Sequence, residues 1–241
     1  MEQRRVVAMG GFPTAPENSL LDRFVLSLAR SQTPRVCFVP TASGDAEGQV
    51  VRFYRVFTAL DCRPTHLQLF DRAVADLESF VLAQDVIYVG GGNTANLLAV
   101  WRTHGLDRVL RRAWEQGVVL CGVSAGMNCW FEASVTDSFG GGRLAPLPDG
   151  LGLLPGSACP HYDGEKQRRP SLLRWVGTGE LPGGWAADDD AALVFAGREL
   201  MEVVASRPGA RGYRVQRMPD GEAGEQVLPA RYLGAQPTDR E

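Results

Sequence analysis

A pentapeptide with a central serine, Gly122-Val123-Ser124-Ala125-Gly126, is the segment of this 241-residue chain that most directly indicates covalent chemistry. Residues 118–121 before it are apolar, and residues 125–131 after it can begin a helix, so Ser124 is predicted at a strand-to-helix turn. Such a turn exposes the hydroxyl on a strained backbone, and the flanking glycines let it close. The Ala125 amide would face an oxyanion formed beside Ser124. The segment therefore predicts a nucleophile for acyl transfer.

A serine nucleophile needs a general base, and the chain has three histidines. His161 is the best candidate because Pro160 and turn residues flank it in a loop-rich region. His66 lies in an apparent strand and His104 in an apparent turn between two helices. These two are predicted to be structural.

The acid that would orient the imidazole has several candidates. Glu132 and Asp137 lie between the serine and His161, and the run Asp188–Asp190 follows the histidine. Three consecutive aspartates are unusual here, because apolar sequence on both sides should bury part of the run. The run is either a solvated turn or the source of a carboxylate that stabilises an imidazolium.

A second glycine-rich turn, Gly90-Gly91-Gly92-Asn93-Thr94, separates an apolar run at 86–89 from a helix-like stretch at 95–101. Three glycines let the backbone approach a ligand closely and present its amides, as in an oxyanion or carboxylate cradle. A phosphate loop and a plain tight turn are the alternatives. The spacings typical of nucleotide-binding loops are not met.

Short apolar runs alternate with amphipathic stretches through the first half of the chain. The expected strands cover residues 5–9, 35–39, 65–69, 86–89 and 118–121, and the expected crossover helices cover 18–29 and 50–60. This alternation predicts an α/β fold with an open, doubly wound, mostly parallel sheet that binds ligands at the carboxyl ends of its strands.

Glycine and proline punctuate the chain after about residue 135, and short strands are expected there. They cover residues 191–195, 200–205 and 213–217, with turns at Ala196-Gly197 and Pro208-Gly209. The last residues, 234–241, are expected to fray. We expect one domain spanning residues 1–241.

Composition excludes several classes of partner. A hydrophobic fraction of 44% and a net charge of -3 give no basic surface for nucleic acid or an anionic membrane, so a small molecule or peptide is expected. The first apolar run is too short for a signal sequence, and no stretch approaches membrane-spanning length, which predicts a cytoplasmic protein.

Metal binding and disulfide bonding are not expected. The histidines lack ligand spacing and the cysteines lack a CxxC pair, so we predict reduced thiols and no metal. The cysteines are Cys37, Cys62, Cys121, Cys129 and Cys159.

Three motifs in a fixed order, Gly90–Thr94, Gly122–Gly126 and Pro160-His161, resemble peptidase family S51 over about residues 6–195. This is the family of dipeptidase E (aspartyl dipeptidase) and, more distantly, cyanophycinase. The resemblance implies a fold similar to class I glutamine amidotransferases, with a serine in place of their cysteine and a chain order of serine, histidine, acid. That order favours the later carboxylates, and matching the family's acidic position places the acid on Asp189, with Asp188 or Asp190 possible if the register of the match shifts by one residue. Dipeptidase E has a glutamate at this point.

The resemblance also implies roles in substrate binding. The amides of Gly92 and Ala125 would form the oxyanion hole, and Asn93 would help to line the substrate site. Aspartyl dipeptidase uses an arginine after the histidine to hold an aspartate side chain. Arg168 or Arg169 would take this role here, although their register differs from the family's pattern.

We therefore predict a serine peptidase that hydrolyses a dipeptide or small peptide through Ser124, His161 and Asp189, without a cofactor, as a monomer or homodimer. One alternative is an amidotransferase-like binding or sensing protein without peptidase activity. The other is a small-molecule esterase, but that class places its acid before a late histidine, and no histidine follows His161.

Overall fold

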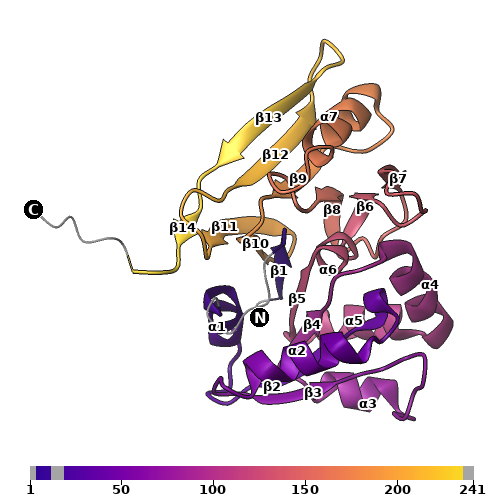
Figure 1. Ribbon diagram of the computed structural model, residues 1–241, viewed down its shortest axis with the longest axis vertical. Coiled ribbons are helices and arrows are strands. Elements are labelled where there is room, and N and C mark those ends of the chain that lie inside the picture. The colour runs from indigo at the N-terminus through magenta and orange to yellow at the C-terminus, as the bar shows by residue number, and fades with distance from the viewer. Residues whose placement is uncertain (1–3, 12–18, 236–241) are drawn as a thin grey trace, which may run out of the picture.

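The computed structural model describes residues 4–11 and 19–235, and its strands form two sheets (Figure 1). The first sheet has eight strands in the order β14-β11-β10-β1-β5-β4-β2-β3. Its strands are β1 (Arg5–Met9), β2 (Arg35–Val39), β3 (Arg63–His66), β4 (Val86–Val89), β5 (Val119–Val123), β10 (Ala191–Ala196), β11 (Glu199–Ala205) and β14 (Arg231–Tyr232). The strands β1 to β5 are mutually parallel, whereas β10 runs antiparallel to both β1 and β11.

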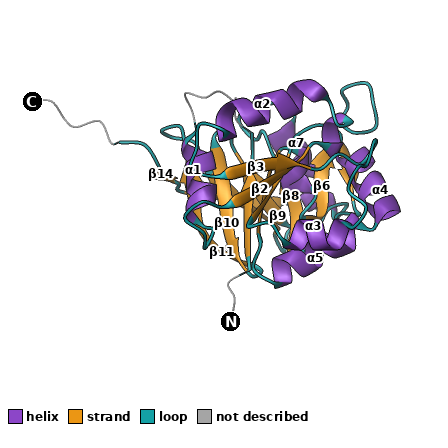
Figure 2. Ribbon diagram, turned by 90° about the horizontal axis from the view of Figure 1, so that it is seen from below, coloured by secondary structure: helices purple, strands orange, loops and turns teal. Residues whose placement is uncertain are grey.

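Helices cover both faces of the first sheet (Figure 2). Neighbouring strand residues alternate between two apolar clusters, so that Val6 belongs to one and Val7 to the other. Burial on both faces explains why the central strands β1, β2, β4 and β5 are almost continuously apolar rather than alternating. The helices are α1 (Leu20–Ser27), α2 (Glu47–Phe57), α3 (Leu77–Leu82), α4 (Thr94–His104) and α5 (Leu106–Glu115), with a short 3₁₀ turn, η2 (Thr41–Ser43). Helices α1 and α2 pack on the Val7 cluster, and α3 to α5 on the Val6 cluster.

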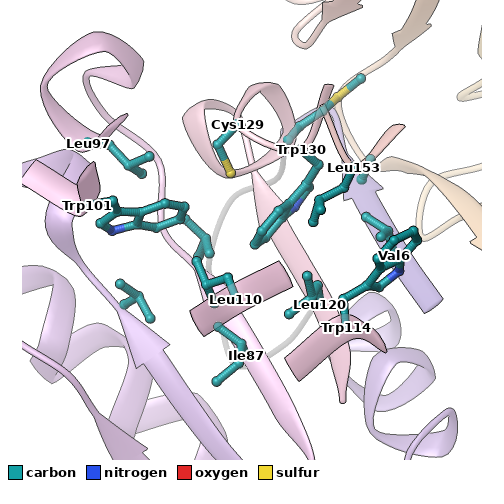
Figure 3. Packing of buried hydrophobic residues seen from close by; sticks show 14 of the residues in the cluster. Val6, Ile87, Leu97, Trp101, Leu110, Trp114, Leu120, Cys129, Trp130 and Leu153 are labelled. Atoms are coloured by element: carbon teal, nitrogen blue, oxygen red, sulfur yellow. The ribbon is translucent and has the colours of Figure 1, made fainter. Parts of the chain in front are cut away.

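Two tryptophans lie at the centre of the Val6 cluster (Figure 3). The rings of Trp101 and Trp130 are both fully buried, and their centroids are 6.1 Å apart. Trp101 lies on α4, and Trp130 follows the short helix α6 (Ala125–Asn128). The packing of these rings therefore fixes the segment that follows Ser124 against the core.

The second sheet has six strands in the order β13-β12-β9-β8-β6-β7. They are β6 (Phe131–Thr136), β7 (Ala145–Leu147), β8 (Leu154–Cys159), β9 (Gly184–Ala187), β12 (Gly212–Arg217) and β13 (Ala223–Leu228). Helix α7 (Arg168–Thr178) packs on this sheet through Leu172, Trp175 and Val176. The chain then crosses from the second sheet to the first between β9 and β10.

The α/β class and the mostly parallel sheet are confirmed, and several expected bounds are corrected. The strands at 5–9, 35–39 and 86–89 form with the expected limits, whereas the strand expected at 65–69 is β3, at 63–66. The helix expected over 125–131 is wrong beyond Asn128, because Phe131 pairs with Leu154 and begins β6. Asn18, in the helix expected at 18–29, lies outside the described residues. No helix of the described part of the chain is long and apolar enough to cross a membrane.

Candidate active site

Ser124 lies in the turn between β5 and α6, as its motif predicts. Its backbone dihedrals are φ 57° and ψ -109°, an unfavourable combination for a residue with a side chain. The amide of Ser124 donates to the carbonyl oxygen of Met9 at 3.1 Å, which ties the turn to the end of β1. The side chain is partly exposed at the carboxyl edge of the first sheet.

The two glycines of the motif are required by close backbone contacts. A Cβ atom on Gly122 would lie 2.4 Å from the carbonyl oxygen of Gly126, and one on Gly126 would lie 2.4 Å from that of Val89. Both distances are shorter than any real Cβ contact. The Gly-x-Ser-x-Gly spacing is thus set by the packing of α6 on β4 and β5.

His161 and Asp189 meet across the ends of two neighbouring parallel strands of the second sheet. His161 follows β8 and Asp189 follows β9. The Nδ1 atom of His161 lies 2.7 Å from Oδ1 of Asp189. This hydrogen bond holds the pKa of the Asp189 carboxyl below its usual value. The carboxylate therefore stays ionised over the range in which an imidazole titrates.

Each of the three consecutive aspartates has different partners. Asp188 is buried, and its Oδ2 accepts from the Arg211 amide at 2.9 Å and from the Tyr213 hydroxyl at 3.2 Å. Burial, together with the nearby charge of Asp163, raises the pKa of Asp188 to about 6. Asp190 has a left-handed backbone, with φ 67°, and contacts Ser206 and Arg207. Of the run, Asp189 is the member that contacts the histidine.

The backbone of Asp189 is held by an ion pair that the sequence did not indicate. Asp163 accepts from the Asp189 amide at 2.8 Å, and Arg207 donates to the Asp189 carbonyl oxygen at 2.9 Å. Asp163 and Arg207 are themselves joined at 2.6 Å. These contacts hold both the amide and the carbonyl group of Asp189, and so fix the backbone from which its side chain extends. Arg207 lies in a short polar turn, Ser206–Gly209, with no sequence feature that distinguishes it from a surface arginine.

Gly11, two residues after the end of β1, packs against His161 and Asp189, while β1 itself contacts the Ser124 turn. A Cβ on Gly11 would lie 2.5 Å from the His161 ring and 2.1 Å from Oδ1 of Asp189, so this backbone packs against both side chains. Met9, two residues earlier, accepts the hydrogen bond from the Ser124 amide. Among the described residues, no hydrogen bond joins the Ser124 hydroxyl to His161. Such bonds are often long before substrate binds.

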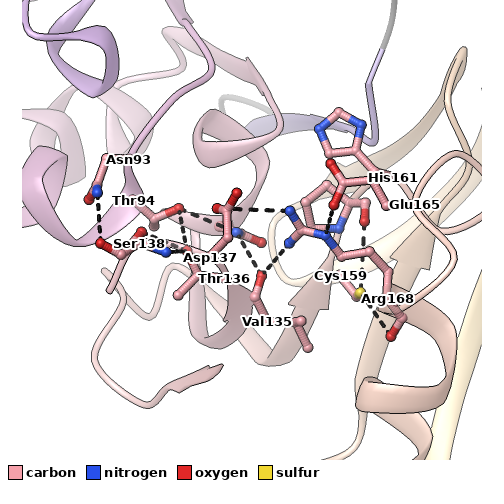
Figure 4. Close-up of polar contacts among 12 residues, drawn as sticks. Asn93, Thr94, Val135, Thr136, Asp137, Ser138, Cys159, His161, Glu165 and Arg168 are labelled. Atoms are coloured by element: carbon pink, nitrogen blue, oxygen red, sulfur yellow. Dashed lines mark hydrogen bonds and ion pairs between the residues drawn. The ribbon is translucent and has the colours of Figure 1, made fainter. Parts of the chain in front are cut away.

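The glycine-rich turn Gly90–Asn93 lies beside Ser124. A Cβ on Gly91 would lie 3.4 Å from Cβ of Ser124, in ordinary contact. Within the described chain, the amides of Gly92 and Ala125 donate to no protein atom. The Asn93 side chain caps α4 by accepting from the Asn96 amide at 2.8 Å, and it donates to the Ser138 carbonyl oxygen at 2.9 Å (Figure 4). A role of Asn93 towards substrate stays a prediction.

The two candidate arginines lie at the start of α7, where protein groups already contact them. The Arg168 side chain is 3% exposed, and it donates to Glu165 at 2.7 Å and to the Val135 carbonyl oxygen at 3.0 Å (Figure 4). Arg169 pairs with Glu225 and lies over the rings of Tyr162 and Tyr213. A role of either arginine in binding a substrate carboxylate stays a prediction.

The remaining histidines and the cysteines lie in structural surroundings. His66 ends β3 and bonds the Tyr54 hydroxyl at 2.9 Å, and His104 ends α4. The cysteines are free, and burial raises the pKa of each thiol, to about 11 for Cys62. In the described ranges, no group of three or more histidine, cysteine or acidic residues has the geometry of a metal site.

Comparison with known proteins identifies the family of this chain. The profile of peptidase family S51 matches residues 6–203. An uncharacterized peptidase, YgaJ, of Bacillus subtilis (strain 168) is 51% identical over 233 residues, which are 96% of this chain and 100% of that protein.

Two solved structures share the fold at low sequence identity. A putative peptidase E protein from Listeria monocytogenes EGD-e has a TM-score of 0.63 and 17% identity, covering 84% of this chain and 98% of its own. A peptidase from an acI-B1 Actinobacterium has a TM-score of 0.68 and 20% identity, covering 95% of each chain. The family profile and the 51% identical relative together show that this chain belongs to peptidase family S51.

Proposed function

We propose that this protein is a serine peptidase that hydrolyses dipeptides or other small peptides through Ser124, His161 and Asp189. The observation that carries the proposal is the 2.7 Å contact between His161 Nδ1 and Asp189 Oδ1. A carboxylate on Nδ1 leaves Nε2 as the atom that accepts a proton from a serine hydroxyl. The strained backbone of Ser124, at the carboxyl edge of the same sheet as Gly11, supports its role as the nucleophile.

The reaction follows from these positions. Ser124 Oγ attacks the carbonyl carbon of the scissile peptide bond while His161 Nε2 takes the hydroxyl proton. His161 gives that proton to the nitrogen of the leaving amine, and the C–N bond breaks to leave an acyl-serine. A water molecule then attacks the acyl-serine, with His161 again the base, and regenerates the Ser124 hydroxyl.

Both charges that form in this cycle, the negative oxyanion and the positive imidazolium, have matching partners. The oxyanion of each tetrahedral intermediate is assigned to the amides of Gly92 and Ala125, which donate to no protein atom in the described structure. The imidazolium of His161 is stabilised by Asp189, whose pKa is held low. We propose that the enzyme acts in the cytoplasm, as a monomer or homodimer, on a small peptide.

A dipeptide panel tests the proposal directly. The wild-type protein should hydrolyse at least some members, and Ser124→Ala should lower kcat by several orders of magnitude while leaving the circular dichroism spectrum unchanged. Ser27→Ala is the matched control, because Ser27 is exposed on α1 and its hydroxyl donates to the carbonyl oxygen of Phe24. Undiminished hydrolysis by Ser124→Ala would remove Ser124 from the mechanism.

A further inference from the structure

A hollow opens next to the turn that carries Ser124. It lies between α2 and the carboxyl ends of β2 and β4, and Gly90, Gly91 and Val123 form the wall nearest the serine. Gly91 is within van der Waals reach of Ser124, since a Cβ there would lie 3.4 Å from Cβ of Ser124. Gly91 and Val123, the residue before the nucleophile, therefore place one wall of the hollow next to the Ser124 turn.

The interior of the hollow is apolar and largely aromatic. The rings of Phe38 and Phe53 are stacked with centroids 4.8 Å apart, and Tyr88 lies against both at 6.1 and 6.3 Å. Each of the three is at most 5% exposed. The volume is about 50 Å³, several times the roughly 10–15 Å³ that one water molecule needs. Because its lining is mostly apolar, the space suits a small apolar group better than water.

Apart from the buried hydroxyl of Tyr88, the polar and charged side chains that line the hollow are Gln49 and Arg52, at its mouth. Gln49 is half-buried and Arg52 is exposed, on the turns of α2 that precede Phe53 and Val56. Neither Arg168 nor Arg169 lines the hollow, and both already contact acidic groups elsewhere. A carboxylate placed deep in this hollow would lose its hydration without gaining a cation.

From these contacts we propose that the hollow is a specificity subsite that takes an aliphatic side chain, such as valine or leucine, from a residue flanking the scissile bond. The inference rests on the proposed peptidase function and names its substrate class. The protein then selects peptides with an aliphatic residue at one of the two positions, rather than peptides with aspartate there. Each methylene group that fits such a subsite changes kcat/KM by about tenfold or more.

The test compares kcat/KM for dipeptides that carry valine, leucine, glycine or aspartate at each position. The wild-type protein should favour valine or leucine over glycine and aspartate at one position by at least about tenfold. Gln49→Trp, which places an indole at the mouth, should abolish this preference while hydrolysis of the glycine peptide continues. Val51→Trp is the matched control, because Val51 is 65% exposed on the same helix and does not line the hollow.

The outcomes separate the two proposals. Hydrolysis with a preference for aspartate, or a Gln49→Trp variant that slows all peptides alike, would overturn the subsite and leave the peptidase proposal standing. A wild-type protein that hydrolyses none of the peptides would overturn the peptidase proposal, and the subsite with it. A preference that Gln49→Trp removes and Val51→Trp retains supports both.

Discussion

His161 Nδ1 lies 2.7 Å from Asp189 Oδ1, although the two residues are 28 positions apart and follow different strands. The contact depends on three surrounding features. The strands β8 and β9 are parallel neighbours, Gly11 has no side chain to intervene, and Asp163 and Arg207 hold the Asp189 backbone. The histidine and its carboxylate are therefore positioned by the second sheet, whereas Ser124 is positioned by the first.

The aspartate run gives a prediction about which carboxylate acts. Asp189→Asn removes the charge beside His161 and favours the wrong tautomer of the imidazole, so kcat should fall by about four orders of magnitude. Asp188→Asn and Asp190→Asn should each change kcat by less than about tenfold, because neither side chain contacts His161 and asparagine tolerates the left-handed backbone of Asp190. Steady-state kinetics on the three variants checks this. A larger loss in either neighbour than in Asp189→Asn would reassign the acid.

Gly11 gives a prediction about packing at the site. Gly11→Ala would place a methyl group 2.1 Å from Asp189 Oδ1 and 2.5 Å from the His161 ring, so one or both side chains must move. We expect kcat/KM to fall by about a hundredfold or more, since misplacement by about 1 Å has that cost. Gly48→Ala on α2 meets nothing within 4 Å and serves as the control. Wild-type kinetics from a folded Gly11→Ala variant would contradict the described arrangement.

Asp22 gives a prediction about stability and pH. It lies on α1, 1% exposed, and burial raises its pKa from 3.8 to about 7, with the Tyr88 hydroxyl acting in the opposite direction. The folded state thus holds the Asp22 proton more tightly than the unfolded chain does. Its contribution to stability is full below pH 3.8 and is lost as the pH rises to about 7.

Asp22→Asn should remove this dependence, because the amide stays neutral. The variant should resemble the wild type at pH 4 and exceed its free energy of unfolding at pH 8, by on the order of a few kcal/mol. Urea unfolding at the two pH values measures the difference, with the exposed Asp61→Asn as the control. A variant that is less stable than the wild type at pH 8 would show that the Asp22 carboxylate is stabilising.

The sequence predicted the first sheet well because the apolar runs and turn residues that define each of its strands lie within short segments of the chain. Strands such as 35–39 and 86–89 are almost continuously apolar and are bounded by turns, and the Gly122–Gly126 pattern lies within five consecutive residues, although Gly126 also packs on Val89 of β4. Of the second sheet, only the strand expected at 213–217 was predicted, and it forms as β12 at 212–217. The strands β6, β8 and β9 were not predicted, since they pair over long separations and β8 contains a proline and a glycine. Phe131 shows the effect, because its pairing with Leu154 ended a helix that local sequence favoured.

The site was predicted in part for the same reason. Ser124 and His161 lie in segments with recognisable turn residues, whereas the choice among Asp188, Asp189 and Asp190 depends on how the chain passes between the sheets. Arg207 reaches the Asp189 backbone from 18 residues away, and nothing in its own segment indicates that contact. The apolar hollow is likewise assembled from α2, β2 and β4 and has no local pattern.

The central claim is that Ser124 is an activated nucleophile, and covalent labelling tests it most directly. The folded wild-type protein is incubated with a fluorophosphonate, and the adduct is located by intact-mass spectrometry and peptide mapping. We predict a single adduct on Ser124, absent from Ser124→Ala and much slower to form in Asp189→Asn. A folded wild-type protein that stays unlabelled, or that is labelled at a different residue, would contradict the account.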